Sequence, residues 1–229
     1  MSSMEAVTTR EAGQRLGITQ ASVRQLVGSG QLTVMGKAGR VLLLNRSSVE
    51  RQAAAGTRRG RAWTPKVAWA ALTMLSGGNP GWISSSEKSR LKSRLRGRTA
   101  EDVALLARHK DRVRRYRVTQ DGMPILQDHL IPGGVSALRS EAVAARFGLT
   151  GGSGIVEGYV MLGDAEQLAA ALGMVEDPDG NAIVREVAFT EPFVDCRAPL
   201  AAIAVDLMGS LSTRERTAGQ RVINELLHV

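Results

Sequence analysis

Two short amphipathic segments separated by one glycine constrain this chain more than any other feature. Apolar residues recur at helical spacing on both sides of Gly17, so each segment has one face to bury. Segments of this length bury those faces by packing on each other, which predicts two helices joined by a sharp turn. Thr19 is the expected N-cap of the second helix, and Gly28 and Gly30 mark its expected end. The apolar positions are Ala12, Leu16, Ile18, Val23, Leu26 and Val27.

A hairpin pattern follows the second segment. Residues 32–35 and 40–44 are rich in β-forming side chains, and residues 36–39 have the composition of a turn. Asn45 or Ser47 is expected to cap a further helix that carries Val49. Two helices, a hairpin and another helix in this order predict a winged helix-turn-helix, which binds duplex DNA.

The pattern also selects candidate contact residues. Burial of the apolar face of the second helix leaves polar side chains outward, where they can bond base edges or phosphates in a major groove. Lys37 and Arg40, at the expected hairpin tip, would face the backbone of the flanking groove. The candidates on the helix are Gln20, Ser22, Arg24 and Gln25.

These residues carry a family resemblance. The run TTREAGQRLGITQASVRQLVGSGQL, continued by MGKAGRVLLLNRSSVE, resembles the DNA-binding domain of MerR-type regulators and excisionases. In that family the reading helix and the wing tip touch DNA, which implies the same role for the six candidates named above. The alternative is a winged-helix module used for protein contacts, whose arginines are ordinary solvated charge.

The charge of the chain is divided unevenly. Residues 1–117 carry 23 Lys and Arg against 7 Asp and Glu, a net +16, whereas residues 118–229 carry 7 against 15, a net −8. This asymmetry predicts that the first half meets a polyanion through a basic surface extending to Arg117. A basic linker at residues 56–62 supplies Arg58, Arg59 and Arg61, interpreted either as an arm along phosphates or as charge for solubility.

The rest of the chain predicts an α+β protein with four parts. Residues 1–55 form the winged helix-turn-helix, residues 56–62 the linker, residues 63–118 a basic helical segment, and residues 119–229 an acidic α/β domain. Helices are expected from Pro65 to Gly77, after Ser84, at residues 100–108 and 165–172, and after Ser212. Strands are expected at residues 113–118, 154–160 and 184–189, and an apolar run at residues 199–207 is interpreted as a buried strand. Asp164 is the expected cap of the helix at residues 165–172.

The basic helical segment contains KSRLKSRLR, with Leu91 and Leu95 four residues apart among cations. This helix is interpreted as a second surface on a DNA backbone, with a solvated amphipathic helix as the alternative. Aromatic residues are 3% of the chain, which argues against binding of single strands through stacked rings.

A second resemblance involves the whole chain. A DNA-binding head, a basic middle and a tail containing AIVREVAFTEPFVD and PLAAIAVDLMGSLSTRERTAGQRVINELL look like actinobacterial antitoxins of the AbiEi type. The resemblance implies an autorepressor paired with a nucleotidyltransferase toxin. The head looks more like a MerR or excisionase wing than the usual antitoxin head, so no functional residue of the tail is carried over.

Enzymatic and metal-binding motifs are missing from the sequence. It has no Walker loop, no G-x-S-x-G and no H-E-x-x-H, and His109, His129 and His228 are far apart. Cys196 is the sole cysteine and is interpreted as a small, half-buried apolar residue. Asp206, Glu186 and Glu191 are candidates for an acidic cluster that the spacing does not require. No catalytic residue, metal or cofactor is therefore predicted.

The chain also lacks an apolar run long enough to span a bilayer and a secretory core near its first residue, so a cytoplasmic protein without membrane contact is expected. Together these features predict a sequence-specific regulator of transcription that binds duplex DNA, acts as an autorepressor and is compatible with a homodimer on inverted repeats. An excisionase-like factor that bends DNA and an enzyme that modifies nucleic acid are the competing hypotheses.

Overall fold

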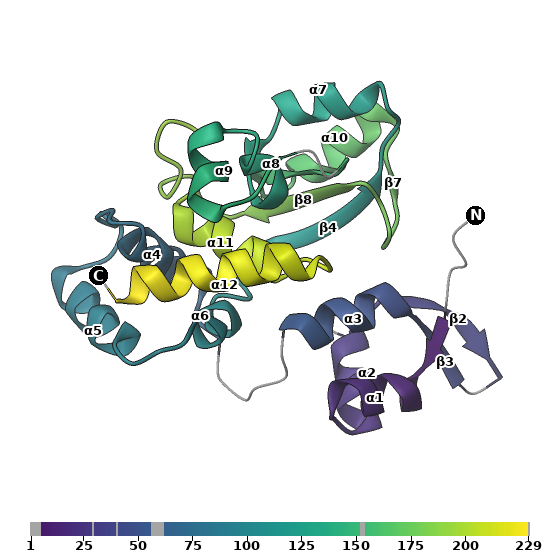
Figure 1. Cartoon of the computed structure of the whole chain (residues 1–229). Coiled ribbons are helices and arrows are strands. Elements are labelled where there is room, and N and C mark those ends of the chain that lie inside the picture. The colour runs from purple at the N-terminus through teal and green to yellow at the C-terminus, as the bar shows by residue number, and fades with distance from the viewer. Residues whose placement is uncertain (1–5, 29, 40, 56–61, 152–153, 229) are drawn as a thin grey trace. The chain divides into compact units, whose positions relative to one another are not determined.

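The computed structural model describes residues 6–28, 30–39, 41–55, 62–151 and 154–228. The chain divides into two compact units, residues 1–59 and residues 60–229 (Figure 1). We call them the head and the body. The protein is of the α+β class and contains two separate sheets.

The head combines three helices with a three-stranded antiparallel sheet. In that sheet β3 lies between β1 and β2. A small core of Ala12, Leu16, Val23, Leu32 and Leu44 holds the helices on the sheet. The elements are β1 (Ala6–Thr8), α1 (Thr9–Leu16), α2 (Gln20–Gly28), β2 (Val34–Ala38), β3 (Val41–Asn45) and α3 (Arg46–Ala55).

Local signals in the sequence predicted the helix ends of the head correctly. Gly17 ends α1 in the left-handed conformation, with φ of 65°, which a glycine adopts at least cost. The Thr19 hydroxyl accepts a hydrogen bond of 3.2 Å from the amide of Ser22 and so caps α2. The Asn45 side chain accepts a bond of 2.8 Å from the amide of Ser48, which caps α3.

The predicted hairpin turn is wrong in position. Gly36 and Lys37 lie within β2, where they pair with Leu43 and Leu42, rather than in a turn at residues 36–39. Val34 pairs with Leu44 and Gly36 with Leu43, so the register shifts between them and Met35 is the extra residue. The change of direction comes later, next to Gly39, whose φ is 61°. A glycine in a strand and a glycine in a turn look the same in the sequence.

The body is a five-stranded sheet between two layers of helices. Its elements are α4 (Pro65–Leu75), α5 (Ser85–Leu95), α6 (Ala100–Leu106), β4 (Arg112–Arg117), α7 (Gly122–Asp128), β5 (Ile131–Pro132), α8 (Gly134–Ala137), α9 (Glu141–Phe147), β6 (Val156–Met161), α10 (Asp164–Leu172), β7 (Val175–Glu176), β8 (Ala182–Val187), α11 (Leu200–Met208) and α12 (Thr213–Leu227). The strand order is β5-β6-β8-β4-β7, in which only the β6 and β8 pair is parallel.

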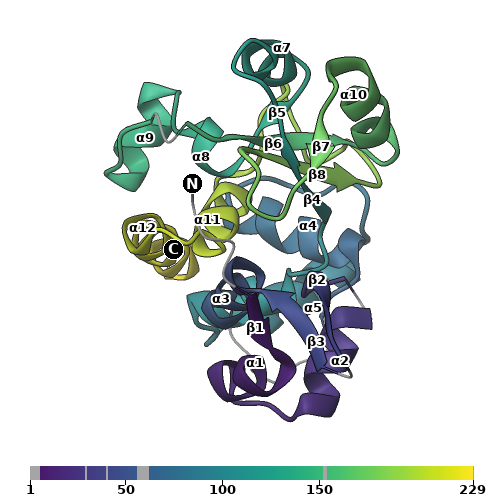
Figure 2. The ribbon, with the colours of Figure 1, turned by 90° about the vertical axis from the view of Figure 1, so that its right-hand side faces the viewer.

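Each face of this sheet has its own hydrophobic core. Side chains alternate between the faces along a strand, so Val156 and Val184 pack with α7 and α10, whereas Tyr159 and Val187 pack with the larger helical layer. Figure 2 shows α7 and α10 on one side of the sheet and α4 and α11 on the other. Trp69 of α4 is fully buried in that larger core.

The helix starts of the body agree with the sequence in most cases. Pro65 occupies the first turn of α4, and Ser84 with Glu87 forms a capping box on α5. The Ser212 hydroxyl accepts a bond from the amide of Glu215 and caps α12. Asp164 does not cap α10, because the N-cap is Gly163 and its neighbour already lies in the helix.

The strand predicted at residues 199–207 is a helix, α11. Periodicity alone does not distinguish a buried helix from a buried strand in a short apolar run. Here the alanines, which favour helix, and burial on nearly every side decide the outcome. Cys196 also differs from its interpretation, because it is exposed and adopts a φ of 55° beside Asp195.

The structure joins the two parts that were predicted to meet at residue 118. Strand β4, from the basic segment, lies inside the sheet between β7 and β8, which come from the acidic part. Helices α4, α5 and α6 share one hydrophobic core with α11 and α12. Residues 63–118 and 119–229 therefore belong to one compact unit.

Candidate nucleic-acid interface

Helix α2 is anchored by one residue and exposes most of the others. Val23 is completely buried in the core of the head, and Leu26 and Val27 pack against that core. The side chains of Gln20, Arg24 and Gln25 are exposed, and Ser22 is half-buried. The structure thus places all four predicted residues of this helix at or beside its outward face.

The N-terminus of α2 borders a shallow hollow of about 520 Å³. The Thr19 and Ser22 hydroxyl oxygens lie 3.0 Å apart at its edge. Gly13 of α1 permits this geometry, because a Cβ at that position would lie 2.9 Å from the Ile18 carbonyl oxygen. The close approach of α1 to the turn leaves the first amides of α2 at a polar, open surface. The hollow is lined by Arg10, Gly13, Gln14, Gly17, Ile18, Thr19, Gln20 and Ser22.

The acidic side chains of the described head are engaged elsewhere. Glu11 accepts bonds from the amide and hydroxyl of Thr8 in a capping box, and these bonds lower its pKa. Glu50 of α3 accepts both an Nε and an Nη2 bond from Arg15, at 3.0 and 2.9 Å. Helix α2 itself contains no acidic residue. Its outward face therefore carries cationic and neutral side chains and no carboxylate.

Three further positions in this region were not predicted from the sequence. Arg10 and Gln14 of α1 line the same hollow as Gln20 and are exposed. Ala21 is exposed in the first turn of α2, between the predicted residues. The signal for Arg10 and Gln14 was present, since both lie opposite the apolar positions Ala12 and Leu16 in the first segment.

The wing residues are only partly described. Lys37 is exposed on β2, opposite Leu42 of β3, and so lies on the side of the hairpin rather than in its turn. Arg40 and the linker residues Arg58, Arg59 and Arg61 lie outside the described residues.

The body contains a buried ionic network that the sequence analysis did not find. Alternation along β6 and β8 puts Glu157, Tyr159 and Arg185 on the sheet face that meets α11. Arg185 Nη2 lies 2.6 Å from Glu157 Oε1, and Lys110 Nζ lies 2.8 Å from Asp206 Oδ1. Asp111 accepts bonds from both cations.

This network joins four segments of the body that are far apart in the sequence. Lys110 and Asp111 directly precede β4, Glu157 and Arg185 come from β6 and β8, and Asp206 comes from α11. The Tyr159 hydroxyl donates to Asp206, and burial raises the pKa of this phenol well above its usual value. Burial opposes ionisation of Asp111, but Lys110 and Arg185 outweigh that effect and lower its pKa.

The acidic cluster considered for Asp206 is therefore replaced by opposite-charge pairs. Glu186 lies on the other face of the sheet, where its Oε2 is 3.2 Å from Arg114 Nε. Glu191 is exposed. Within the described part of the chain, no three His, Cys, Asp or Glu side chains are placed to hold a metal ion.

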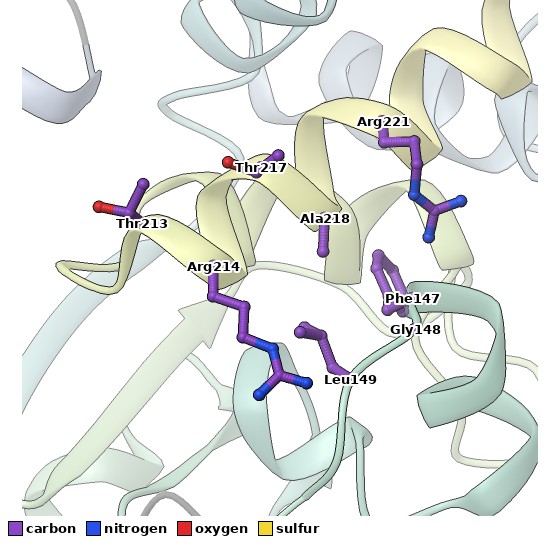
Figure 3. Close-up of a pocket in the computed structure, with 8 residues that line it drawn as sticks. All are labelled: Phe147, Gly148, Leu149, Thr213, Arg214, Thr217, Ala218 and Arg221. Atoms are coloured by element: carbon purple, nitrogen blue, oxygen red, sulfur yellow. The ribbon is translucent and has the colours of Figure 1, made fainter.

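A second hollow, of about 320 Å³, lies between α12 and the end of α9 (Figure 3). Its walls are Phe147, Leu149 and the α12 side chains Arg214, Thr217 and Arg221. Arg221 donates to Glu225 at 2.5 Å and to the Arg146 carbonyl at 3.0 Å. The lining contains no carboxylate, histidine or cysteine. This hollow therefore provides no side chain that acts as a general base at neutral pH.

Comparison of the chain with protein-family models, curated proteins and solved structures finds no match. Among the described residues, every helix is too short or too polar to cross a bilayer.

Proposed function

We propose that the head is a winged helix-turn-helix that binds duplex DNA, with α2 in the major groove. The observation that carries this proposal is the outward face of α2, which is rich in hydrogen-bonding groups, includes Arg24 and has no acidic side chain. Glutamine and arginine side chains suit the donor and acceptor pattern of base edges. Ala21 suits close apposition to a thymine methyl group.

The same geometry divides the contacts into two classes. Gln20, Arg24 and Gln25 would read bases, whereas Arg10 and Lys37 would hold phosphates on either side of the groove. The N-terminus of α2 adds the partial positive charge of a helix end, which favours a phosphate near Thr19. Phosphate contacts position the protein, and base contacts specify the sequence.

A DNA-binding head attached to a separate folded body is the organisation of a transcription regulator. We propose repression of its own operon as the role of the full chain, with the antitoxin role and a nucleotidyltransferase partner resting on the resemblance of the tail alone. The second candidate function is that of an excisionase-like factor, which rests on the resemblance of the head to excisionases. A bending assay on the preferred duplex separates the two, since an architectural factor bends its site and a simple repressor has no need to.

The test of the reading face uses the full chain and a duplex selected from a randomised pool. Arg24→Ala is expected to reduce discrimination between the selected and a random duplex by roughly 1–3 kcal/mol. Lys37→Ala is expected to weaken both duplexes alike and to reduce the slope of log K against log salt by about 1. Fluorescence anisotropy at several salt concentrations measures both quantities.

Arg15→Ala is the matched control for these variants. It removes an exposed arginine of the head that already pairs with Glu50, so discrimination is expected to stay as in the unaltered chain. Failure of the unaltered chain to prefer any duplex, or an equal loss on both duplexes for Arg24→Ala, would contradict the proposal.

A further inference from the structure

Helix α5 and the residues that follow it form a densely cationic surface of the body. Residues 88–98 contain six Lys and Arg and no acidic residue. Leu91 and Leu95 are buried against the rest of the body, whereas the cations alternate with serines on the opposite side. The α5 surface, as we name it, consists of Lys88, Arg90, Lys92, Arg94, Arg96 and Arg98.

No cation of this surface forms an ion pair with a carboxylate of the described chain, although the charge of Arg90 acts on Glu87 and helps to lower its pKa. Lys92, Arg94 and Arg96 make no side-chain hydrogen bond or ion pair with any residue that the structure describes. The other three donate only to neutral oxygens: Lys88 to the Asn79 side chain at 2.6 Å, Arg90 to Ser86 and Arg98 to the Arg94 carbonyl. The neighbouring Glu87 is held by Ser84 in the capping box.

This arrangement works against the stability of the helix itself. Lys88 and Lys92, and likewise Arg90 and Arg94, are four residues apart, a spacing at which like charges repel. The helix dipole favours the cations of the last turn, Lys92 and Arg94, but not those nearer the N-terminus. These like charges lower the stability of the helix and form no ion pair within the described chain. The pattern therefore indicates a negatively charged partner outside the chain.

The composition of the surface selects the class of that partner. It has no exposed apolar side chain to enter a membrane, because the two leucines of α5 face the core. It has no aromatic ring to stack the bases of a single strand or to anchor a protein partner. At ~1.5 Å per residue the 11 residues of α5 extend for about 16 Å, the length of roughly five base pairs at ~3.4 Å each.

We propose that the α5 surface binds the phosphate backbone of duplex DNA, as a contact of the body additional to those of the head. This inference rests on the proposed function, because it assigns both surfaces to one duplex. A second surface on the same chain raises the overall affinity and its dependence on salt, while base contacts in the head continue to determine sequence preference.

The experiment compares two triple variants of the full chain with equal loss of charge. Lys92→Gln/Arg94→Gln/Arg96→Gln removes the unpartnered cations of the α5 surface. Arg139→Gln/Arg197→Gln/Arg214→Gln removes three other exposed cations of the body. Anisotropy titrations with the selected duplex and a random duplex are run at several KCl concentrations, and thermal unfolding checks that both variants fold.

For the α5 variant, the slope of log K against log salt is expected to fall by about 2–3, at ~0.9 per phosphate contact, with roughly tenfold or greater loss of affinity on both duplexes. The ratio between the duplexes is expected to stay constant. The control variant is expected to keep the slope of the unaltered chain. An unchanged slope in the α5 variant, or an equal change in the control, would overturn the inference.

Two further probes test whether the α5 surface prefers a ligand other than duplex DNA. The combined results for the two variants distinguish failure of this inference from failure of the proposed function of the head. Tighter binding of the α5 surface to an equal length of single-stranded DNA, or to vesicles containing phosphatidylserine, would also overturn it. If Arg24→Ala loses sequence discrimination while the α5 variant binds normally, the inference fails and the proposed function stands. If the α5 variant loses affinity but no duplex is preferred, sequence reading fails and the phosphate surface stands.

Discussion

Two segments of the body look alike in the sequence and differ completely in the fold. Residues 88–98 and residues 108–117 each contain six Lys and Arg. In the first segment the cations are mostly exposed and lack carboxylate partners among the described residues, whereas in the second Lys110, Arg114 and Arg117 lie in ion pairs. The density of basic residues therefore does not show which of them are available to a ligand.

The difference follows from the position of each segment in the fold. Strand β4 has neighbours on both sides, and β7 and β8 bring Glu176 and Glu186 beside Arg114. Helix α5 meets the core with one face only, so its polar face has no adjacent element to supply acids. The basic surface predicted to extend to Arg117 is thus interrupted at β4, where the charge is balanced internally.

The largest expected difference between the segments is in stability. Lys110→Met leaves Arg185 as the remaining cation beside the buried Asp111 and Asp206, which is expected to lower the free energy of unfolding by about 3–5 kcal/mol. Lys92→Met, the same change on α5, is expected to stay within about 0.5 kcal/mol of the unaltered chain. Urea unfolding at neutral pH measures both, and similar losses would remove the distinction. The double change Lys110→Met/Asp206→Leu is expected to recover part of the loss.

A smaller effect is expected at the capping box, which stabilises α5 although its cations form no ion pairs. Ser84→Ala removes the capping box and is expected to cost about 1 kcal/mol at pH 7. Ser93→Ala, on the exposed side of the same helix, is the control and is expected to be neutral or slightly stabilising. If Ser93→Ala lowered the free energy of unfolding as much as Ser84→Ala, the capping box would not be the source of the stability lost in Ser84→Ala.

The capping box also predicts a pH dependence. The bonds from the Ser84 amide and hydroxyl lower the pKa of Glu87 below its usual 4.5. A carboxylate with a depressed folded-state pKa adds stability above its unfolded-state pKa, and that stability is lost as the pH falls through the folded-state value. The difference between the unaltered chain and Ser84→Ala is therefore expected to shrink in acid. A constant difference from pH 7 to pH 3 would contradict this.

The smallest effect is expected at the exposed end of β4. Arg117 Nε lies 2.6 Å from Asp177, with more than half of the arginine side chain exposed. Arg117→Gln is expected to cost about 0.5 kcal/mol at low salt and less at 1 M salt, where charges are screened. Arg96→Gln, without an ion pair, is expected to show no such loss. Equal, salt-independent effects at the two positions would indicate that the Arg117 pair contributes nothing.

Local chemistry accounts for what the sequence predicted well. The left-handed Gly17, the Thr19 and Asn45 caps and the Ser84 capping box each depend on residues within three or four positions of one another. Interactions at that range survive any arrangement of the rest of the chain. The outward positions of Gln20, Arg24 and Gln25 were predictable for the same reason, because helical periodicity and the buried Val23 determine them.

Long-range contacts account for the features that the sequence did not predict. Asp206 has Lys110, Tyr159 and Arg185 as partners, which are all far from it in sequence, and no spacing rule joins them. The helix at residues 200–208 and the position of Gly36 in a strand depend on the layers that surround them. Helical periodicity turns Arg10 and Gln14 outward, but their position beside the start of α2 depends on the close approach of the two helices at Gly13.

The sequence by itself determined the helix ends, the polar outward face of α2 and the unequal distribution of charge, because these depend on neighbouring residues or on composition. Only the tertiary structure decided which cations face a partner outside the chain. An arginine in an ion pair with a glutamate is neutralised whatever its sequence context, and β4 has such pairs whereas the cations of α5 form none among the described residues. Which side chains pair across a sheet depends on neighbours in three dimensions, so the fold left the cations of the α5 surface facing solvent and placed those of β4 beside acidic partners.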